Sequence, residues 1–170
     1  MKSRGFSLIE LLVVVSIIGV LASLVIGSLH DIRIRARDTR RLADMKSIQT
    51  SLELYYLLHG EYPRVDWASS HLDSWGGLES VLGQELPVDP LNITETTSLA
   101  PFNDSYFYGY YGAVASSRGC SGQAYLLVIN LEGVDDRTSG VELCDGYFYG
   151  YGDSMVVGVD RYGNLVAPGI

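Results

Sequence analysis

The sequence predicts an α+β protein in which a long N-terminal α-helix packs on a C-terminal antiparallel β-sheet. An apolar run passes into an amphipathic segment, and no proline interrupts the chain between Phe6 and Tyr62. From Tyr106 onward, short runs rich in Tyr, Val and Leu alternate with Gly, Asp, Ser and Asn, which is typical of strands and turns. A chain of 170 residues is long enough to bury one modest core beneath such a sheet.

The N-terminus begins with a short basic leader, residues 1–5, and continues into the apolar segment 6–29. The stretch 11–29 contains no charged residue, and as a helix it would cover about 28 Å of hydrocarbon. The length therefore predicts a membrane-spanning helix over residues 6–29. An ordinary secretory signal is the alternative, because Val20-Leu21-Ala22 followed by Ser23 could serve as its cleavage site.

Glu10 lies inside this apolar segment and distinguishes it from an ordinary signal. A carboxylate within a bilayer costs about 2.5–3.5 kcal/mol on insertion scales, so it needs a partner. No Lys, Arg or His lies between Phe6 and Leu29. A cut after Gly5 would create a cation, the α-amino group of Phe6, one helical turn from Glu10.

The run from Gly5 to Val14, GFSLIELLVV, resembles the processing site and helix start of type IV pilins and pseudopilins. The resemblance implies that a prepilin peptidase cuts after Gly5 and methylates Phe6, and that Glu10 guides assembly. It also implies a pilin fold and a single-pass precursor in the cytoplasmic (inner) membrane that becomes an extracellular or cell-envelope filament. The implied partners are identical or related pilin subunits in a helical filament, the peptidase, an inner-membrane assembly platform, and membrane lipid before assembly.

Residues 30–60 form the expected amphipathic half of the helix. Apolar residues recur at steps of three and four, at Leu42, Met45, Ile48, Leu52 and Tyr55. His59-Gly60 followed by Pro63 predicts the helix end. The sequence from Ala43 to Tyr56 and from Gly60 to Pro63 is also similar to major pseudopilins.

Five arginines follow the apolar segment, and three interpretations of them stay open. They could contact lipid headgroups, pair with acidic domains of neighbouring subunits, or form a solvated face, which is the default. The positive-inside rule alone would place the large domain in the cytoplasm, against the export that the leader implies. The five are Arg33, Arg35, Arg37, Arg40 and Arg41.

Residues 61–105 are expected to connect the helix to the sheet domain, residues 106–170. A short helix is predicted for Leu78 to Leu82, after the turn-forming Trp75-Gly76-Gly77. Leu86-Pro87-Val88-Asp89-Pro90 is similar to the turn through which pseudopilins enter their sheet. The predicted strands are Tyr106 to Tyr111, Ala124 to Leu131, Val141 to Cys144, Tyr147 to Tyr151 and Met155 to Val159.

A five-residue sequence, Tyr-Phe-Tyr-Gly-Tyr, occurs twice, at residues 106–110 and 147–151. In a strand, the three tyrosines of each copy would share one face. They are expected either to pair across the sheet or to form an exposed aromatic patch for adhesion or subunit packing.

Cys120 and Cys144 are the only cysteines and are expected to form a disulfide if the domain is exported. No cofactor is expected, because the cysteines lack the spacing of a zinc site. Calcium is a weaker alternative, since type II secretion pseudopilins hold calcium near their C-terminus. The candidate ligands are Asp135, Asp136, Glu142, Asp145 and Asp153, although their spacing is not that of an EF-hand.

Charge and motif content argue against two classes of function. Residues 1–46 carry eight Lys/Arg and four Asp/Glu, whereas residues 47–170 carry four and sixteen, so the globular domain is not expected to bind nucleic acid. The histidines His30, His59 and His71 are scattered without a nucleophile, so no enzyme is expected. The sequence favours a type IV pilus-like filament subunit. The alternatives are a pseudopilin of a type II secretion or DNA-uptake system, and a singly anchored extracellular binding protein.

Overall fold

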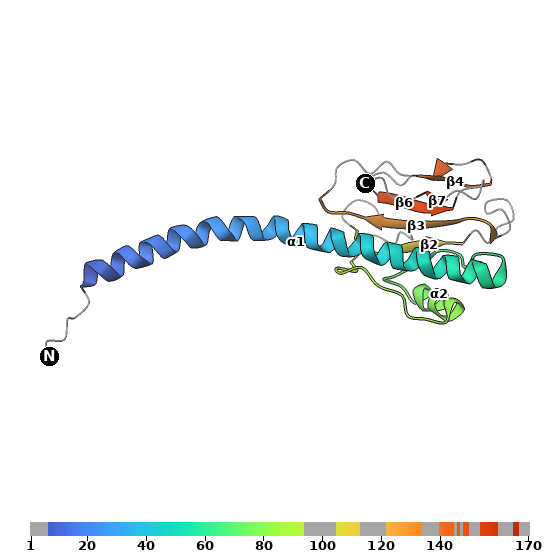
Figure 1. The fold of residues 1–170 in the computed structure, drawn as a ribbon, viewed down its shortest axis with the longest axis horizontal. Coiled ribbons are helices and arrows are strands. Elements are labelled where there is room, and N and C mark those ends of the chain that lie inside the picture. The colour runs from blue at the N-terminus through green and yellow to red at the C-terminus, as the bar shows by residue number, and fades with distance from the viewer. Residues whose placement is uncertain are drawn as a thin grey trace.

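The computed structural model describes residues 7–93, 105–112, 122–133, 140–144, 146, 148–149, 154–159 and 165–166. Its dominant element is helix α1, Leu8–His59, which has 52 residues and is about 78 Å long. The N-terminal part of α1 projects away from the rest of the protein, while its C-terminal part lies along a β-sheet (Figure 1). The predicted α+β class, with a long helix packed on an antiparallel sheet, is confirmed.

Both ends of α1 follow local signals in the sequence. Ser7 is the N-cap in an extended conformation, and Gly60 is the C-cap in the left-handed region, with φ 75°. The Gly60 N–H donates to the Tyr56 carbonyl at 2.7 Å and so closes the last turn. Only glycine adopts this φ without strain, which explains why the helix stops where the sequence predicts.

The membrane-spanning segment expected at residues 6–29 is described only in part, because residue 6 and the side chains of residues 24–28 lie outside the described residues. Within the part of the chain that the structure describes, no helix combines the length and the apolar character needed to cross a membrane.

The connecting region holds strand β1, Ala68–Ser69, and helix α2, Ser74–Leu82. The predicted helix at residues 78–82 is confirmed, but it begins earlier than expected, and Gly76 and Gly77 lie within it. Trp75 and Leu78 on this helix are both buried. Burial of these two side chains outweighs the low helix propensity of the two glycines.

The main sheet has five antiparallel strands in the order β1-β2-β3-β6-β7, and β4 and β5 form a separate pair. All five predicted strand regions contain strands, whereas the short β1 and β7 were not predicted. The strands of the C-terminal half are β2 Gly109–Tyr111, β3 Tyr125–Asn130, β4 Val141–Glu142, β5 Phe148–Tyr149, β6 Ser154–Val159 and β7 Leu165–Val166.

Both faces of the main sheet are buried at its central strand, β3. Tyr125, Leu127 and Ile129 belong to the core beneath α1, together with Met45, Ile48 and Leu52 of that helix. Leu126 and Val128 point the other way and pack in a smaller core with Val141 of β4 and with Leu143. The period of two along a strand thus divides β3 between two cores, and all six of its residues are buried.

The core-facing side of α1 differs from the predicted stripe at its N-terminal end. Met45, Ile48 and Leu52 are buried as predicted, but Leu42 is 40% exposed and Arg41 is fully buried. Arg41 precedes Met45 by four residues and Ile48 by seven, so it continues the buried stripe. Assigning Leu42 to the core was therefore wrong, because the position facing the domain is taken by an ion-paired arginine.

The tyrosines of the first Tyr-Phe-Tyr-Gly-Tyr copy are structural. Tyr108 and Tyr110 are fully buried, and their hydroxyls donate to Asp44 at 2.8 Å and to the Pro63 carbonyl at 2.7 Å. An exposed aromatic patch at this copy is therefore excluded. The two copies contribute to different sheets, through β2 and β5, so they do not pair with each other. Tyr147 and Tyr151 of the second copy lie outside the described residues.

Candidate assembly site

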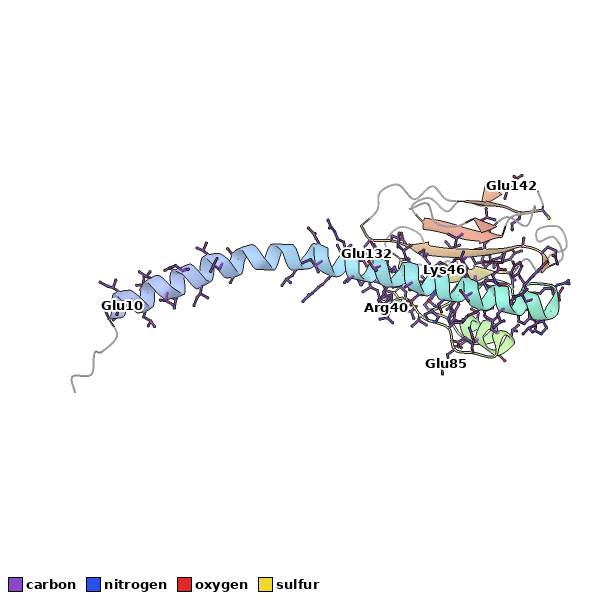
Figure 2. All side chains as sticks on the ribbon, in the orientation of Figure 1. Glu10, Arg40, Lys46, Glu85, Glu132 and Glu142 are labelled. Atoms are coloured by element: carbon purple, nitrogen blue, oxygen red, sulfur yellow. The ribbon has the colours of Figure 1, made fainter. Side chains whose placement is uncertain are left out.

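The tip of α1 places Glu10 far from the globular domain, as Figure 2 shows. Glu10 lies at the third helical position, and its Oε2 accepts a hydrogen bond from the Ser7 backbone N–H at 2.9 Å. This bond is the glutamate half of a capping box, and it satisfies a donor that the helix leaves free. A carboxylate at a helix N-terminus is also favoured by the helix dipole. Glu10 therefore has a local role within its own chain.

Both residues of the predicted processing site, Gly5 and Phe6, lie outside the described residues. Cleavage after Gly5 and methylation of Phe6 therefore stay predictions. The helix begins directly after them, at Leu8, with Ser7 as its cap. A cut at the expected place would leave the new amino group next to the helix N-terminus.

The projecting part of α1 carries exposed apolar side chains all round, and it extends beyond the described part of the globular domain (Figure 1). Its large apolar side chains are 47 to 79% exposed from Leu8 to Leu21. A helix that is hydrophobic all round is found where other apolar groups surround it, either in a protein core or in a membrane. This chain supplies no such cover among its described residues. The exposed residues are Leu8, Ile9, Leu11, Leu12, Val13, Val14, Val15, Ile17, Ile18, Val20 and Leu21.

An ion cluster lies where α1 reaches the domain, and it consists of Arg37, Asp38, Arg41, Asp89 and Glu132. The Arg41 guanidinium, fully buried, binds Asp89 through two nitrogens at 2.7 and 3.1 Å. Its Nη1 also donates to Asp38 at 2.8 Å and to Glu132 at 2.6 Å. Three segments far apart in sequence, namely α1, the connecting region and the end of β3, are therefore joined by one side chain.

Arg37 completes the cluster by donating through Nε and Nη2 to the two carboxylate oxygens of Glu132, the first at 2.7 Å. Asp38 in turn accepts the backbone N–H groups of Glu132 at 3.0 Å and Gly133 at 2.9 Å. The Tyr106 ring lies 4.8 Å from the Arg41 guanidinium carbon, in cation–π contact. Every charge in the cluster thus has at least one opposite partner.

The electrostatics of the cluster favour its ionised form. Burial alone would lower the pKa of Arg41, but its hydrogen bonds to Asp89, Glu132 and Asp38 outweigh burial and raise the pKa. The hydrogen bonds from Arg37 are the largest cause that holds the pKa of Glu132 below its usual value. Paired charges of this kind stay ionised at neutral pH and hold the three segments together.

The structure corrects the default interpretation of the five arginines as one solvated face. Arg41 is buried and Arg37 is half-buried, while Arg33, Arg35 and Arg40 are exposed. Sequence reasoning missed the ion cluster, although one signal for it was present. Arg41 lies at helical spacing from Met45, Ile48 and Leu52, which is the spacing of the core.

Cys144 is disulfide-bonded, whereas its expected partner Cys120 lies outside the described residues. Of the calcium candidates, Glu142 lies in β4, and Asp135, Asp136, Asp145 and Asp153 lie outside the described residues. The described residues contain no group of three His, Cys, Asp or Glu that could hold a metal ion. The Cys120–Cys144 pairing and calcium binding both stay predictions.

His71 and His59 serve packing and local hydrogen bonding. His71 packs against the Phe107 ring with centroids 4.1 Å apart, and burial lowers its pKa. His59, in the last turn of α1, stacks on Tyr55 at 3.9 Å, and its Nδ1 lies 3.0 Å from the Tyr55 carbonyl oxygen. Neither contact places a histidine beside a nucleophile.

A family comparison confirms the motif at the helix tip. Residues 1–26 match the family described as the prokaryotic N-terminal methylation motif. The long exposed helix that begins in this motif and packs on a small antiparallel sheet is the arrangement that the resemblance to type IV pilins and pseudopilins implies. The resemblance to this class is therefore confirmed.

The relatives include type II secretion proteins and a type IV pilin. The chain is 40% identical over 62 residues to type II secretion system core protein G of Escherichia coli (strain K12), covering 36% of this chain and 43% of that protein. The protein of the same name from Pectobacterium carotovorum subsp. carotovorum is 37% identical over 65 residues, 38% of this chain and 42% of the relative. The type IV major pilin protein PilE of Neisseria gonorrhoeae is 28% identical over 100 residues, 59% of each chain. The chain thus spans about half the length of the relatives it matches, and no solved structure matches it.

Proposed function

We propose that this protein is a structural subunit of a type IV pilus-like filament, assembled through the exposed N-terminal half of α1. The observation that carries the proposal is the apolar projecting helix, which no described part of the domain covers and which begins in the methylation motif. Side-by-side packing of such helices from many copies would remove this surface from water, and the hydrophobic effect would drive it. The relatives are pilins and pseudopilins, which are structural subunits rather than enzymes.

The proposed sequence of events begins with insertion of residues 6–29 into the cytoplasmic membrane. A prepilin peptidase then cuts after Gly5 and methylates Phe6, and an assembly platform extracts the subunit into the filament. The new amino group keeps a positive charge at neutral pH, so it can form an ion pair with the carboxylate of Glu10 on a neighbouring subunit. A carboxylate has about four acceptor positions, so capping Ser7 leaves Glu10 able to bind this cation.

Substitution of Glu10 by glutamine separates its two roles. Glutamine also suits the third position of a capping box, so Glu10→Gln is expected to preserve the helix start while it removes the charge. We expect Glu10→Gln to be processed normally and to lose polymerisation, measured by electron microscopy and by sedimentation of the full chain. Normal filaments of Glu10→Gln would refute the electrostatic part of the proposal.

Mass spectrometry of the mature N-terminus provides the test of processing. The expected first residue is a methylated Phe6, and a Gly5→Ala variant serves as the control that should stay uncut. A mature chain that begins after Ala22 would instead indicate an ordinary secretory signal.

A pseudopilin of a type II secretion system is the second candidate, and the core protein G relatives favour it. Deletion of the gene separates the two candidates. Loss of long surface fibres indicates a pilin, whereas loss of protein secretion in a strain without visible fibres indicates a pseudopilin. A singly anchored binding protein, the candidate of another class, would give no ladder of cross-linked copies.

A further inference from the structure

The connecting region contains a triplet, Asn92-Ile93-Thr94, with the form Asn-X-Thr that accepts N-linked glycans. Neither the apolar helix nor the ion cluster uses this triplet. The structure describes its first two residues, whereas Thr94 lies outside the described residues. The contacts of Asn92 and Ile93 therefore decide whether the acceptor side chain is open to modification.

The side chain of Asn92 is held by Ser70, the residue that follows β1. The Ser70 hydroxyl donates to Asn92 Oδ1 at 2.8 Å, and Asn92 Nδ2 donates to the Ser70 carbonyl at 3.1 Å. Ser70 is itself buried and fixed to the sheet, because its N–H donates to the Tyr108 carbonyl at 2.8 Å. The Tyr108 N–H in turn donates to the Ser70 hydroxyl at 2.9 Å. The amide of Asn92 is thus bound through both of its polar atoms to the edge of the main sheet.

The backbone of the triplet is bound as well. The Asn92 N–H donates to Asp89 Oδ1 at 3.3 Å, and the same carboxylate binds Arg41 in the ion cluster. Ile93 and Tyr106 exchange two backbone hydrogen bonds, at 2.9 and 2.8 Å. The chain is therefore fixed on both sides of Asn92, to α1 through Asp89 and to the sheet domain through Ile93.

The backbone conformation of Asn92 is also unusual. Its φ is 47°, and within the part of the chain that the structure describes it is the only residue other than glycine with a positive φ. Asparagine tolerates this left-handed conformation better than most residues, because its short polar side chain can form local hydrogen bonds. The bonds to Ser70 and Asp89 hold Asn92 in this conformation.

We infer that Asn92 fastens the connecting region to the edge of the main sheet, and that folding thereby closes its triplet to N-glycosylation. Glycosyl transfer forms a bond from the sugar C1 to Asn92 Nδ2 and releases one amide proton, so the enzyme must take this nitrogen into its own active site. In the folded chain that step would break the two bonds to Ser70 and the two bonds between Ile93 and Tyr106. The triplet is then an acceptor in the unfolded chain and a structural element in the folded one.

A double-mutant cycle between Asn92 and Ser70 tests the fastening, by urea unfolding of the full chain in detergent. Asn92→Gly keeps the left-handed conformation free of strain and removes the side-chain bonds, so the equilibrium constant for unfolding is expected to rise about tenfold. Ser70→Ala should raise it at least as much, because the Tyr108 N–H also loses its acceptor. The double variant should show less than the product of the two single effects, since both remove the same hydroxyl–amide bond. A full product, or no effect of Asn92→Gly, would overturn the inference.

Closure of the triplet is tested with an N-glycosyltransferase that transfers glucose from UDP-glucose to asparagine in Asn-X-Thr triplets. The folded full chain is compared with its own tryptic digest, in which residues 65–118 form one peptide that contains the triplet. Mass spectrometry is expected to find at least about tenfold more glucose on Asn92 in the digest than in the folded chain at equal times. Equal occupancy would show that folding does not close the triplet. A digest that accepts no glucose on Asn92 would equally overturn the inference, because the sequence rather than the fold would then exclude the modification.

Discussion

At the scale of single residues, Arg41 shows how a charged side chain can occupy a core position. Arg41 lies on the same face of α1 as Met45, Ile48 and Leu52. An apolar residue would ordinarily be expected at such a position. Burying an unpaired guanidinium would be very costly, so its four hydrogen bonds to three carboxylates are needed for the fold. Asp89 thereby becomes the residue that ties the connecting region to α1.

Replacement of Arg41 by methionine is expected to destabilise the protein strongly. The methionine would fit the apolar stripe, but it would leave Asp38, Asp89 and Glu132 facing a single remaining arginine. Breaking a buried ion pair from one side costs about 3–5 kcal/mol. Urea unfolding of the full chain in detergent measures this loss through the fluorescence of Trp67 and Trp75, the only tryptophans.

The matched control for this prediction is Arg40→Met. Arg40 is 62% exposed and its nearest carboxylate is 3.6 Å away, so its loss should change stability by less than about 0.5 kcal/mol. Equal effects of the two substitutions would show that burial of the Arg41 charge is not what stabilises the cluster.

At the scale of elements, replacing two helix glycines by alanine is expected to change the stability of the protein in opposite directions. Gly60 ends α1 with φ 75°, whereas Gly77 lies inside α2 without a positive φ. A Cβ added to either would meet no atom within 4 Å, so conformation alone distinguishes them.

Alanine at Gly60 is therefore expected to destabilise the protein by about 1 kcal/mol, because the left-handed conformation strains an L-residue. Alanine at Gly77 is expected to stabilise it by roughly 0.5–1 kcal/mol, because glycine is a poor residue in a helix interior. The midpoints of thermal unfolding of the two variants should lie on opposite sides of the unaltered protein. Shifts of the same sign would contradict the assigned ends of α1 and α2.

At the scale of the whole molecule, the ion cluster holds the helix, the connecting region and the sheet in one body. Arg37 and Arg41 face Asp38, Asp89 and Glu132 from these three segments. Among the described residues, the apolar half of α1 has no ion pair to the domain, beyond which it projects (Figure 1). The cluster and the packing of Met45, Ile48 and Leu52 against the sheet therefore both connect α1 to the domain.

Acid is expected to weaken this connection. The pKa of Glu132 is lowered in the folded protein, so its contribution to stability is fully present above its ordinary value of 4.5 and is lost as the pH falls through the lowered folded pKa. Urea midpoints measured at successively lower pH should fall for the unaltered chain. Glu132→Gln should be less stable at neutral pH and should show a smaller loss below pH ~4.5. Parallel curves for the two proteins would exclude a stabilising role for the Glu132 charge.

Much of the fold could be predicted because its signals are local. The absence of proline before Pro63 and the glycine at position 60 predicted α1 nearly to its ends. A continuous run of apolar residues from Tyr125 to Ile129 predicted β3, as is typical of a strand that is buried on both faces. Two strands of two residues each, β1 and β7, escaped prediction because pairing with β2 and β6, rather than local propensity, defines them.

The features of the candidate site also differ in whether local sequence or tertiary structure determines them. The sequence by itself determined the methylation motif, the position of Glu10 and the uninterrupted apolar helix, because each depends only on residues that are neighbours in the chain. Only the tertiary structure decided that Arg41 is buried and paired with Asp89 and Glu132. The partners lie 48 and 91 residues away, and whether a charge can be buried depends on what folding brings beside it.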